Sequence, residues 1–357
     1  MEAIFLDSTF KSVDTVDVFN SFIWTDRYNS FGNFELSIKP TSDYLSLLNE
    51  SGYINIEESE HTMFIEDINI KTNIEDGNEL IIKGRSLESM LDRRIIWDPD
   101  NYIGDFQMDG VYHILNVNIF GATPTSRQIP GFKFIITDDN YIENLTINEQ
   151  FFGEIIYDVV SDLCFSRNVG FKIILDEEDP YEWFKFSLYM GKDRSFGQSS
   201  NPYVLFSPNS DNLINADYFK TNRFLKTIAL IAGERGVANV QLTATAYTSS
   251  GTGLNRREIF LEPSNIKRQS PGTIITDSEY VEMLEEIGLK ELSKMKVIEL
   301  VDGEVDASLF SYGTDFNMGD IVQLEDAYGH LSTSRINEVI FSHDTSGFKI
   351  LPIFETI

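Results

Sequence analysis

The sequence predicts a mainly β protein of the α+β class, and three observations lead to that prediction. Apolar and polar residues alternate along much of the first hundred residues and again after about residue 207, as in half-buried strands. Clusters of Gly, Asp and Ser interrupt these runs in the manner of turns. Between the two strand-rich regions, turns are denser and one clear amphipathic helix stands out. We therefore expect antiparallel sheets toward both ends of the chain and an α+β region between them.

Length and charge limit the possible function classes. The chain has 357 residues, 42% of them apolar, which is enough for two or three domains with buried cores. Its 57 acidic and 28 basic residues give a formal charge of −29. Nucleic-acid binding through phosphate contacts needs clustered Lys and Arg, so this balance argues against it. The charge indicates either a surface that favours solubility or one that repels a polyanion.

The first region predicts a series of antiparallel strands followed by a short helix. Asp76-Gly77-Asn78 has the sequence of a hairpin turn. Ser86 is a plausible N-cap for a helix whose face is formed by Leu87, Met90 and Leu91. The strand-like runs occupy 34–38, 54–56, 65–70 and 80–83.

One helix is predicted in the middle region. Thr146 and Glu149 have the spacing of a capping box, in which each side chain covers a free amide at the helix start. Cys164, the only cysteine, falls in the apolar pattern and is predicted to be a buried structural thiol rather than a reactive one. The apolar stripe ends near Arg167 and consists of Phe152, Ile155, Ile156, Val159 and Leu163.

Four consecutive acids, Asp176 to Asp179, precede Pro180 and raise the question of a metal site. A calcium loop of the EF-hand type needs acids at alternate positions around a central glycine, which this run lacks. An exposed acidic turn is the better interpretation.

The last region predicts more strands and a second helix. Residues 227–232 are apolar enough for strand or helix, but the nearby glycines Gly233 and Gly236 favour a strand. A second capping box, Thr276 to Glu279, opens a helix expected over about 278–296. Its acids come first and its lysines last, which matches the helix dipole.

Residues 316–352 predict a three-stranded antiparallel meander, with alternating runs over 321–325, 334–341 and 348–353. Gly319 and Gly347 lie where the chain turns and are expected to need a positive φ. Asp320 is expected to hydrogen-bond the local backbone.

The search for chemistry predicts no catalytic, cofactor-binding or metal site. The four histidines lie far apart in the sequence, and one cysteine allows neither an internal disulfide nor a multi-cysteine zinc site. The chain contains neither a nucleophile elbow nor a phosphate-binding loop. We therefore expect no cofactor and no enzymatic activity. Without a signal peptide or an apolar run of roughly 18 residues, we expect folding in a cytoplasm and no membrane insertion.

Four stretches, taken in order, resemble the baseplate hub or tail-tip hub proteins of long-tailed, siphovirus-type phages, which are related to the hub region of tail-associated lysin proteins. The middle of the chain matches only loosely, and the matching pieces are turns and barrel corners rather than motifs for chemistry. The stretches are FIWTDRYNSFGNFELSIKP (22–40), LIIKGRSLESMLDRRIIW (80–97), SSGTGLNRREIFLEPSNI (249–266), and YGTDFNMGDIV through SRINEVIFSHDTSGFKILPIF (312–354).

The resemblance implies a fold and an assembly. The chain would contain a first hub β-barrel domain (1–98), an α+β middle domain (99–206) and a second hub β-barrel domain (207–357) with the helix near 278–296. Three subunits would form a homotrimeric ring that closes the tail tube, adapts a sixfold tail to a threefold tip, and opens for the tape-measure protein and DNA. Implied neighbours are a distal tail protein ring, the tape-measure protein and a tail fibre or receptor-binding protein. Phage DNA would pass through the channel without specific binding. The location would be the tail tip of the virion, after assembly in the host cytoplasm.

Two alternatives remain open. The middle region could bind a receptor or a cell-wall glycan, and its aromatics would be the candidate platform, although their alternation over both faces of a strand favours core packing. The chain could also be the hub part of a peptidoglycan hydrolase, but it ends at Ile357, soon after the last matching stretch, so we expect no lytic module. The aromatics concerned are Tyr181, Trp183, Phe184, Phe186 and Tyr189.

In the hub interpretation, acids would line the channel and basic residues such as Arg93 and Arg94 would face neighbouring subunits. A prophage-derived injection device built on the same hub is a further possibility.

Overall fold

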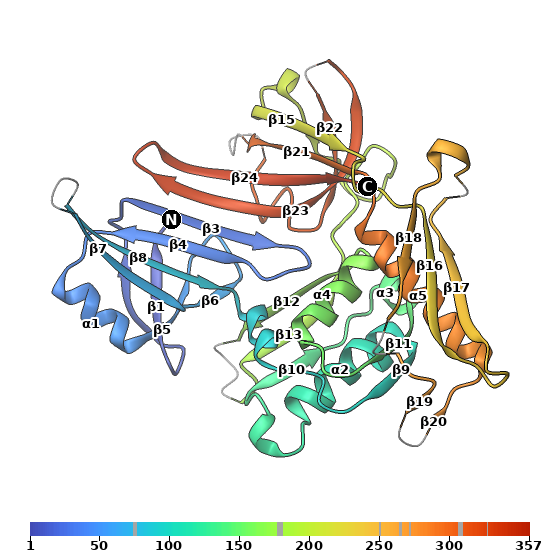
Figure 1. Cartoon of the computed structure of the whole chain (residues 1–357). Helices are drawn as coiled ribbons and strands as arrows, with labels where there is room; N and C mark the ends of the chain where they lie inside the picture. The colour runs from blue at the N-terminus through green and yellow to red at the C-terminus, as the bar shows by residue number, and fades with distance from the viewer. Residues whose placement is uncertain are drawn as a thin grey trace. The chain divides into compact units, whose positions relative to one another are not determined.

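The computed structural model describes the chain except residues 74–76, 177–180, 250, 264–265, 271–272, 306–309 and 327. The described residues form a mainly β fold with several helices (Figure 1). They group into two compact units, each assembled from separate stretches of the chain. Unit 1 comprises Met1–Met90, Gly170–Phe219 and Glu299–Ile357, and unit 2 comprises Leu91–Val169 and Lys220–Ile298.

A ten-stranded sheet organises unit 1. Its path runs β15-β21-β24-β23-β3-β4-β8-β7, and β22 pairs with β23 on one side and with β14 on the other. The strands are β3 (Ser21–Arg27), β4 (Asn33–Ile38), β7 (Asp67–Asn73), β8 (Gly77–Arg85), β14 (Leu205–Phe206), β15 (Leu213–Thr221), β21 (Ile298–Val305), β22 (Ile321–Glu325), β23 (Leu331–Asp344) and β24 (Gly347–Thr356).

Smaller elements complete unit 1. A second sheet has the order β2-β1-β5-β6, and β12 pairs antiparallel with β13. These elements are β1 (Ala3–Asp7), β2 (Ser12–Val16), α1 (Ser42–Glu50), β5 (Ser51–Asn55), β6 (Thr62–Phe64), β12 (Gly170–Leu175), β13 (Phe184–Tyr189) and the 3₁₀ turn η5 (Pro208–Ser210).

Alternating side chains of the main sheet build the core of unit 1. Phe34, Leu36 and Ile38 of β4 are all buried, as the period of two requires. Aromatic rings dominate this core, and rings of this size supply most of the apolar area that a core buries. The largest buried members include Phe22, Trp24, Tyr28, Phe34, Phe206 and Phe316.

The mainly β, α+β class is confirmed, but barrel-like closure is not. Within the described residues, the main path of the ten-stranded sheet has two ends, at β15 and at β7. The predicted domain bounds (1–98, 99–206, 207–357) do not coincide with the two units. β3 from the first region pairs with β23 from the last, so strands from both ends of the chain share one sheet.

The C-terminal meander is confirmed. β22 pairs antiparallel with β23, and β23 with β24, the long hairpin drawn in red in Figure 1. Both turn glycines have the expected backbone, with φ of +83° at Gly319 and +111° at Gly347. The predicted hairpin between β7 and β8 is also present, although its turn residue Asp76 lies outside the described residues.

Unit 2 combines a helical part with a three-stranded sheet. Strand β9 pairs with β11, while β17, β16 and β18 form the sheet, with β16 and β18 parallel. Its strands are β9 (Asp100–Asp105), β10 (Phe132–Ile135), β11 (Thr146–Phe151), β16 (Ile228–Arg235), β17 (Gln241–Tyr247), β18 (Glu258–Leu261), β19 (Gln269–Ser270) and β20 (Thr273–Ile274). Its helices are η2 (Phe106–Tyr112), α2 (His113–Leu115), η3 (Asn116–Phe120), η4 (Thr125–Arg127), α3 (Asn140–Glu143), α4 (Ile156–Ser166), η6 (Gly253–Asn255) and α5 (Asp277–Lys294).

Helix α5 covers one face of the three-stranded sheet, and its capping box at Thr276 and Glu279 is confirmed. Gly288 lets the helix approach the strands closely. A Cβ added there would lie 2.5 Å from Ile231 Cδ1 and 2.6 Å from Ala246 Cβ. The strand predicted for 227–232 is also confirmed, as β16.

Two local predictions are wrong in detail. The segment from Thr146 to Phe151 is strand β11, which pairs with β9 along six residues, so Thr146 caps no helix. Helix α4 begins later, at Ile156, with no side-chain cap, although it ends beside Arg167 as expected. The short helix after Ser86 is a 3₁₀ helix, η1 (Leu87–Arg93), rather than an α-helix.

Candidate functional site

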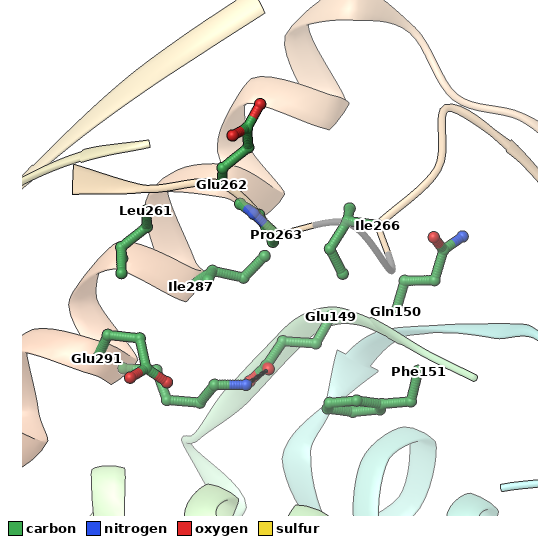
Figure 2. Close-up of a pocket in the computed structure, with 10 residues that line it drawn as sticks. Glu149, Gln150, Phe151, Leu261, Glu262, Pro263, Ile266, Ile287 and Glu291 are labelled. Atoms are coloured by element: carbon green, nitrogen blue, oxygen red, sulfur yellow. Dashed lines mark hydrogen bonds and ion pairs between the residues drawn. The ribbon is translucent and has the colours of Figure 1, made fainter. Parts of the chain in front are cut away.

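The best-defined hollow of unit 2 is a groove of about 280 Å³ between β11 and the segment that runs from β18 to α5 (Figure 2). Apolar side chains form one wall, and Glu149, Gln150 and Lys290 supply the polar part. Figure 2 shows the Glu262 carboxylate pointing away from Glu149 and Phe151. The lining residues are Glu149, Gln150, Phe151, Leu261, Glu262, Pro263, Ile266, Ile287, Lys290 and Glu291.

Glu149 is the most buried charge of this groove, with only 1% of the residue exposed. Lys290 of α5 binds one of its carboxylate oxygens, Oε2. The other, Oε1, lies 3.7 Å from Arg167 Nη1, within ion-pair range but beyond a hydrogen bond. A buried carboxylate is costly unless cations compensate it, and Lys290 and Arg167 supply that compensation to Glu149.

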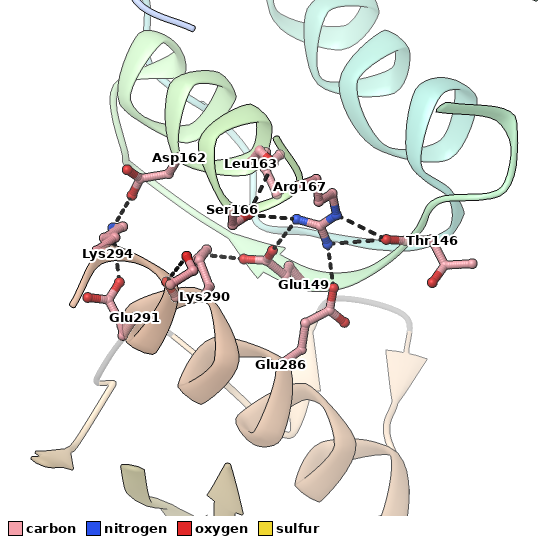
Figure 3. Close-up of polar contacts among 11 residues, drawn as sticks. Thr146, Glu149, Asp162, Leu163, Ser166, Arg167, Glu286, Lys290, Glu291 and Lys294 are labelled. Carbon is pink, nitrogen blue, oxygen red and sulfur yellow. Dashed lines mark hydrogen bonds and ion pairs between the residues drawn. The ribbon is translucent and has the colours of Figure 1, made fainter. Parts of the chain in front are cut away.

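Arg167, at the end of α4, joins three elements (Figure 3). It donates from Nε and Nη2 to the backbone oxygen of Thr146, at 3.2 Å each, and from Nη2 to Glu286 Oε1 at 2.5 Å. Burial and the nearby Glu149 carboxylate raise the pKa of Glu286 above its ordinary value, while Arg167 acts in the opposite direction. The guanidinium therefore ties α4, β11 and α5 together.

Lys294 extends this network by one turn of α5. Its ammonium donates to Asp162 Oδ2 at 2.6 Å and to Glu291 Oε1 at 3.0 Å. Burial alone would lower the pKa of Lys294, but hydrogen bonds to the two carboxylates outweigh it and raise that pKa. Three cations thus meet four carboxylates across α4, β11 and α5, and we call this set the unit 2 ion clamp: Glu149, Asp162, Arg167, Glu286, Lys290, Glu291 and Lys294.

A second buried charge cluster lies in unit 1. The Glu88 carboxylate accepts a hydrogen bond from the Ile173 backbone N–H at 2.7 Å and lies 3.2 Å from His61 Nδ1. Asp26 accepts hydrogen bonds from Trp24 at 2.8 Å and from Ser59 at 2.6 Å. Burial alone would lower the pKa of His61, but Asp26 and Glu88 raise it to about 9. The two carboxylates therefore favour the charged form of the buried His61.

Unit 1 also has a larger groove, of about 480 Å³, beside the loop that carries Glu57, Glu58 and Glu60. Asp320, predicted to bond the local backbone, lies at this groove and is 2% exposed. It accepts from the backbone N–H of Asn317 at 3.0 Å, as expected, and also from Arg194 Nε at 2.7 Å. Asp320 therefore anchors a buried ion pair in addition to its turn.

The structure places Cys164 and most of the candidate aromatics in packed surroundings. Cys164 is fully buried, and burial raises the pKa of its thiol, so it is the structural thiol that was predicted. Phe184 and Phe186 lie in a core, and Trp183 packs edge-on against Phe10 at 5.1 Å. Of the five candidate aromatics only Tyr181, 84% exposed, lies largely in solvent.

Neither a metal cluster nor a membrane-spanning helix is found in the part of the chain that the structure describes. Most of the acid run at 176–179, considered above for metal binding, lies outside those residues. Sequence reasoning missed the ion clamp because it assigned Glu149 to a helix cap. The available signal was the pair Lys290 and Lys294, one turn apart on α5, which can hold two carboxylates on one face.

A family model and several solved structures match nearly the whole chain. The family model described as Siphovirus ReqiPepy6 Gp37-like protein matches residues 3–354. Among curated proteins, none matches the sequence.

Three solved structures share the fold. They are prophage tail protein gp18 from Listeria monocytogenes EGD-e (11% identity, TM-score 0.57, covering 99% of this chain and 94% of that one), a tail protein from Neisseria meningitidis MC58 (12%, 0.59, 99% and 96%), and the 43 kDa tail protein of prophage MuSo2 from Shewanella oneidensis (13%, 0.57, 100% and 98%). At these identities the likeness shows a common fold. The predicted resemblance to tail proteins of long-tailed phages is thereby confirmed.

Proposed function

The chain belongs to the Siphovirus ReqiPepy6 Gp37-like protein family, and from this premise we propose that it is the structural baseplate or tail-tip hub of a phage tail. The observation that carries the proposal is the likeness, over nearly the full length of both chains, to three tail proteins, two of them from prophages. In this role it forms a homotrimeric ring that closes the tail tube and adapts a sixfold tail to a threefold tip. The ring opens for the tape-measure protein and for DNA.

The edges of the main sheet of unit 1 support assembly into a ring. β7 exposes Ile68 and Ile70, about half of each residue, and β15 exposes Tyr218 and Phe219 to a similar extent. A free strand edge with apolar side chains is a template for pairing with another chain. The sheet has such an edge at each of its two ends, which suits contacts with two neighbouring subunits, one at each edge.

The proposed neighbours follow from this position at the tail tip of the virion. A distal tail protein ring would lie above the hub, the tape-measure protein inside it, and a tail fibre or receptor-binding protein around it. DNA would pass through without specific binding, because phosphate contacts need clustered cations that an acidic channel does not offer. The side chains of the ion clamp bond to one another, which suits a structural role better than chemistry.

Mass measurement in solution tests the proposal directly. Light scattering on purified protein at micromolar concentration and ordinary salt is expected to give about three times the 40.8 kDa of one chain. A monomer under all conditions, including with a distal tail protein ring added, would contradict the hub. Zymography on cell walls and a glycan-binding assay address the hydrolase and receptor-binding alternatives, and both are expected to be negative.

A further inference from the structure

One loop of unit 1 presents two aromatic side chains to solvent. It spans residues 194–204, between β13 and β14, and we call it the aromatic loop. Phe196 is 46% exposed and Tyr203 is 66% exposed, and their rings meet edge-on with centroids 5.2 Å apart. Within the described residues, the Tyr203 hydroxyl has no hydrogen-bond partner. Both rings are therefore available to a partner.

The two ends of the aromatic loop are fastened together. Val204 N–H donates to Arg194 O at 3.0 Å, and Arg194 N–H donates to Ile321 O at 2.7 Å. The Arg194 guanidinium also forms a buried ion pair with Asp320, at 2.7 Å. A loop whose ends meet in this way is an Ω-loop, a type of segment that is frequently functional.

A single side chain organises the interior of the aromatic loop. Gln198 Nε2 donates to the backbone oxygens of Ser195 and Asn201, at 3.1 and 3.0 Å. Its Oε1 accepts from the backbone N–H groups of Ser200 and Asn201, at 2.7 and 2.8 Å. Because these bonds order the backbone before any partner arrives, little conformational entropy is lost when the rings enter a contact.

The composition of the aromatic loop suits a contact between acidic chains. Residues 195–204 contain no charged side chain, although 24% of the whole chain is charged. Two copies with a net charge of −29 each can therefore meet at this loop without local repulsion between like charges. Aromatic side chains held on an ordered segment are typical anchors of protein interfaces.

The groove of unit 2 in Figure 2 offers surroundings that match such an anchor. Its apolar wall includes Leu261, Pro263 and Ile287. Pockets for drug-sized ligands begin at roughly 300 Å³, so a groove of about 280 Å³ suits a single aromatic side chain. Glu149 lines this groove, and its Oε1 has no hydrogen-bond donor among the described residues. A phenol O–H can supply that donor.

We propose that the aromatic loop of one copy inserts Tyr203 into this groove of a second copy, with the Tyr203 hydroxyl donating to Glu149. Phe196 supports the inserted ring through their edge-on contact. Because the two contacting surfaces are different parts of the chain, the contact is head-to-tail, the kind of interface that closes a ring. The inference rests on the proposed self-assembly and names one pair of surfaces that meet in it.

The larger groove of unit 1 is a poorer receptor for the Tyr203 ring. Its lining includes the carboxylates of Glu57, Glu58, Glu60 and Asp320, whereas apolar side chains make up half of the lining of the unit 2 groove. Asp320 also fastens the base of the aromatic loop through Arg194. The unit 1 groove therefore borders the loop in its own chain.

Substitutions in the aromatic loop test the contact from one side. Tyr203→Phe keeps the ring and is expected to raise the dissociation constant of the oligomer at least about 10-fold, because a hydrogen bond to a charged acceptor is lost. Phe196→Ala with Tyr203→Ala, the loop variant, is expected to raise it at least about 100-fold. The matched control is Tyr328→Ala with Leu331→Ala, at two other exposed positions of unit 1. It is expected to leave the constant within about threefold.

Mixing two defective chains tests whether the loop and the groove bind each other. Leu261→Trp fills the groove with a side chain that strands tolerate, and it is expected to prevent trimer formation as the loop variant does. In the mixture, the intact groove of the loop variant can accept the intact loop of Leu261→Trp. A 1:1 heterodimer of about twice 40.8 kDa is therefore expected in sedimentation. Circular dichroism and thermal melts establish which variants fold.

The outcomes separate this inference from the proposed hub. A loop variant that assembles like the wild type would overturn the inference and leave the hub intact. A mixture that stays monomeric would overturn the pairing of loop and groove. If Leu261→Trp does not fold, Tyr203→Phe decides, and an unchanged dissociation constant would overturn the inference. A wild-type chain that never self-associates would overturn the proposed self-assembly as well.

Discussion

At the scale of single residues, two glycines with similar backbones differ in what surrounds them. Gly319 and Gly347 both have positive φ, where a Cβ is strained. A Cβ on Gly319 would lie 2.3 Å from Tyr28 Cε2, whereas a Cβ on Gly347 would meet no atom within 4 Å. Backbone strain therefore acts at both positions, and a steric clash only at the first.

This difference predicts the cost of alanine at each position. Gly347→Ala is expected to lower the free energy of unfolding by about 1 kcal/mol, through backbone strain alone. Gly319→Ala adds the clash with the buried Tyr28 ring and is expected to cost about 2–4 kcal/mol. Urea denaturation of both variants measures the two costs. Equal losses would show that the Tyr28 ring moves aside at little expense.

The buried His61 gives a pH-dependent contribution to stability with a definite sign. Its pKa rises from an ordinary 6.5 to about 9 in the folded protein, because Asp26 and Glu88 outweigh burial. Because the raised pKa means that the folded state favours protonated His61, this group adds stability that is fully present below about pH 6.5. That stability is lost as the pH rises through about 9. Burial also raises the pKa of Asp26, whereas His61 lowers the pKa of Glu88 against the effect of its burial.

We therefore expect the wild-type free energy of unfolding to fall between about pH 6.5 and pH 9.5 by a few kcal/mol at most. His61→Gln removes the titrating group, so its unfolding free energy is expected to be lower at pH 6 and flatter over that window. Denaturant titrations at four pH values measure both slopes. The exposed His330→Gln is the control, and a wild-type slope retained in His61→Gln would exclude His61 as its source.

At the scale of elements, the capping-box pattern predicted one helix start correctly and one incorrectly. The capping box at Thr276 opens α5, as its pattern predicts. The equivalent pair Thr146 and Glu149 lies in β11, because the strand pairs with β9 and Gly153, at φ +86°, interrupts the chain before α4 begins. A capping motif expresses only a local preference for a helix. Here, pairing with a strand distant in sequence outweighed that preference.

The ion clamp predicts unequal effects along α5. Lys290→Met leaves the buried Glu149 carboxylate with Arg167 at 3.7 Å as its nearest remaining cation, and is expected to lower the free energy of unfolding by about 3 kcal/mol. Lys294→Met breaks a half-exposed pair with Asp162, where an ion pair contributes at most about 1 kcal/mol. Thermal and urea unfolding of the two variants provide the comparison. A larger loss in Lys294→Met would contradict the burial argument.

At the scale of the whole molecule, periodicity predicted most strands but not how they combine. The meander of β22, β23 and β24 was predictable because its partners are adjacent in sequence. The pairing of β23 with β3 was not, since about three hundred residues separate them and no local pattern records the partner. The two-unit division has the same cause: the chain leaves unit 1 after Met90 and returns at Gly170.

The net charge of the chain predicts how salt affects the proposed trimer. Three copies would bring a charge of −29 each around one channel, and we expect acids to line it, so that transiting DNA is repelled rather than bound. This repulsion between copies is long-range, and salt screens it beyond roughly 8–10 Å at physiological strength. Attraction between oppositely charged groups at the subunit contacts acts at short distance and is screened only at higher salt.

The two effects have opposite signs, so the dissociation constant is expected to pass through a minimum. Raising salt from about 20 to about 150 mM should tighten the trimer by relieving repulsion, and raising it to about 500 mM should weaken the trimer again. Sedimentation over that range measures the constant. A wild-type constant that does not change with salt would show that the charge of the chain does not govern assembly.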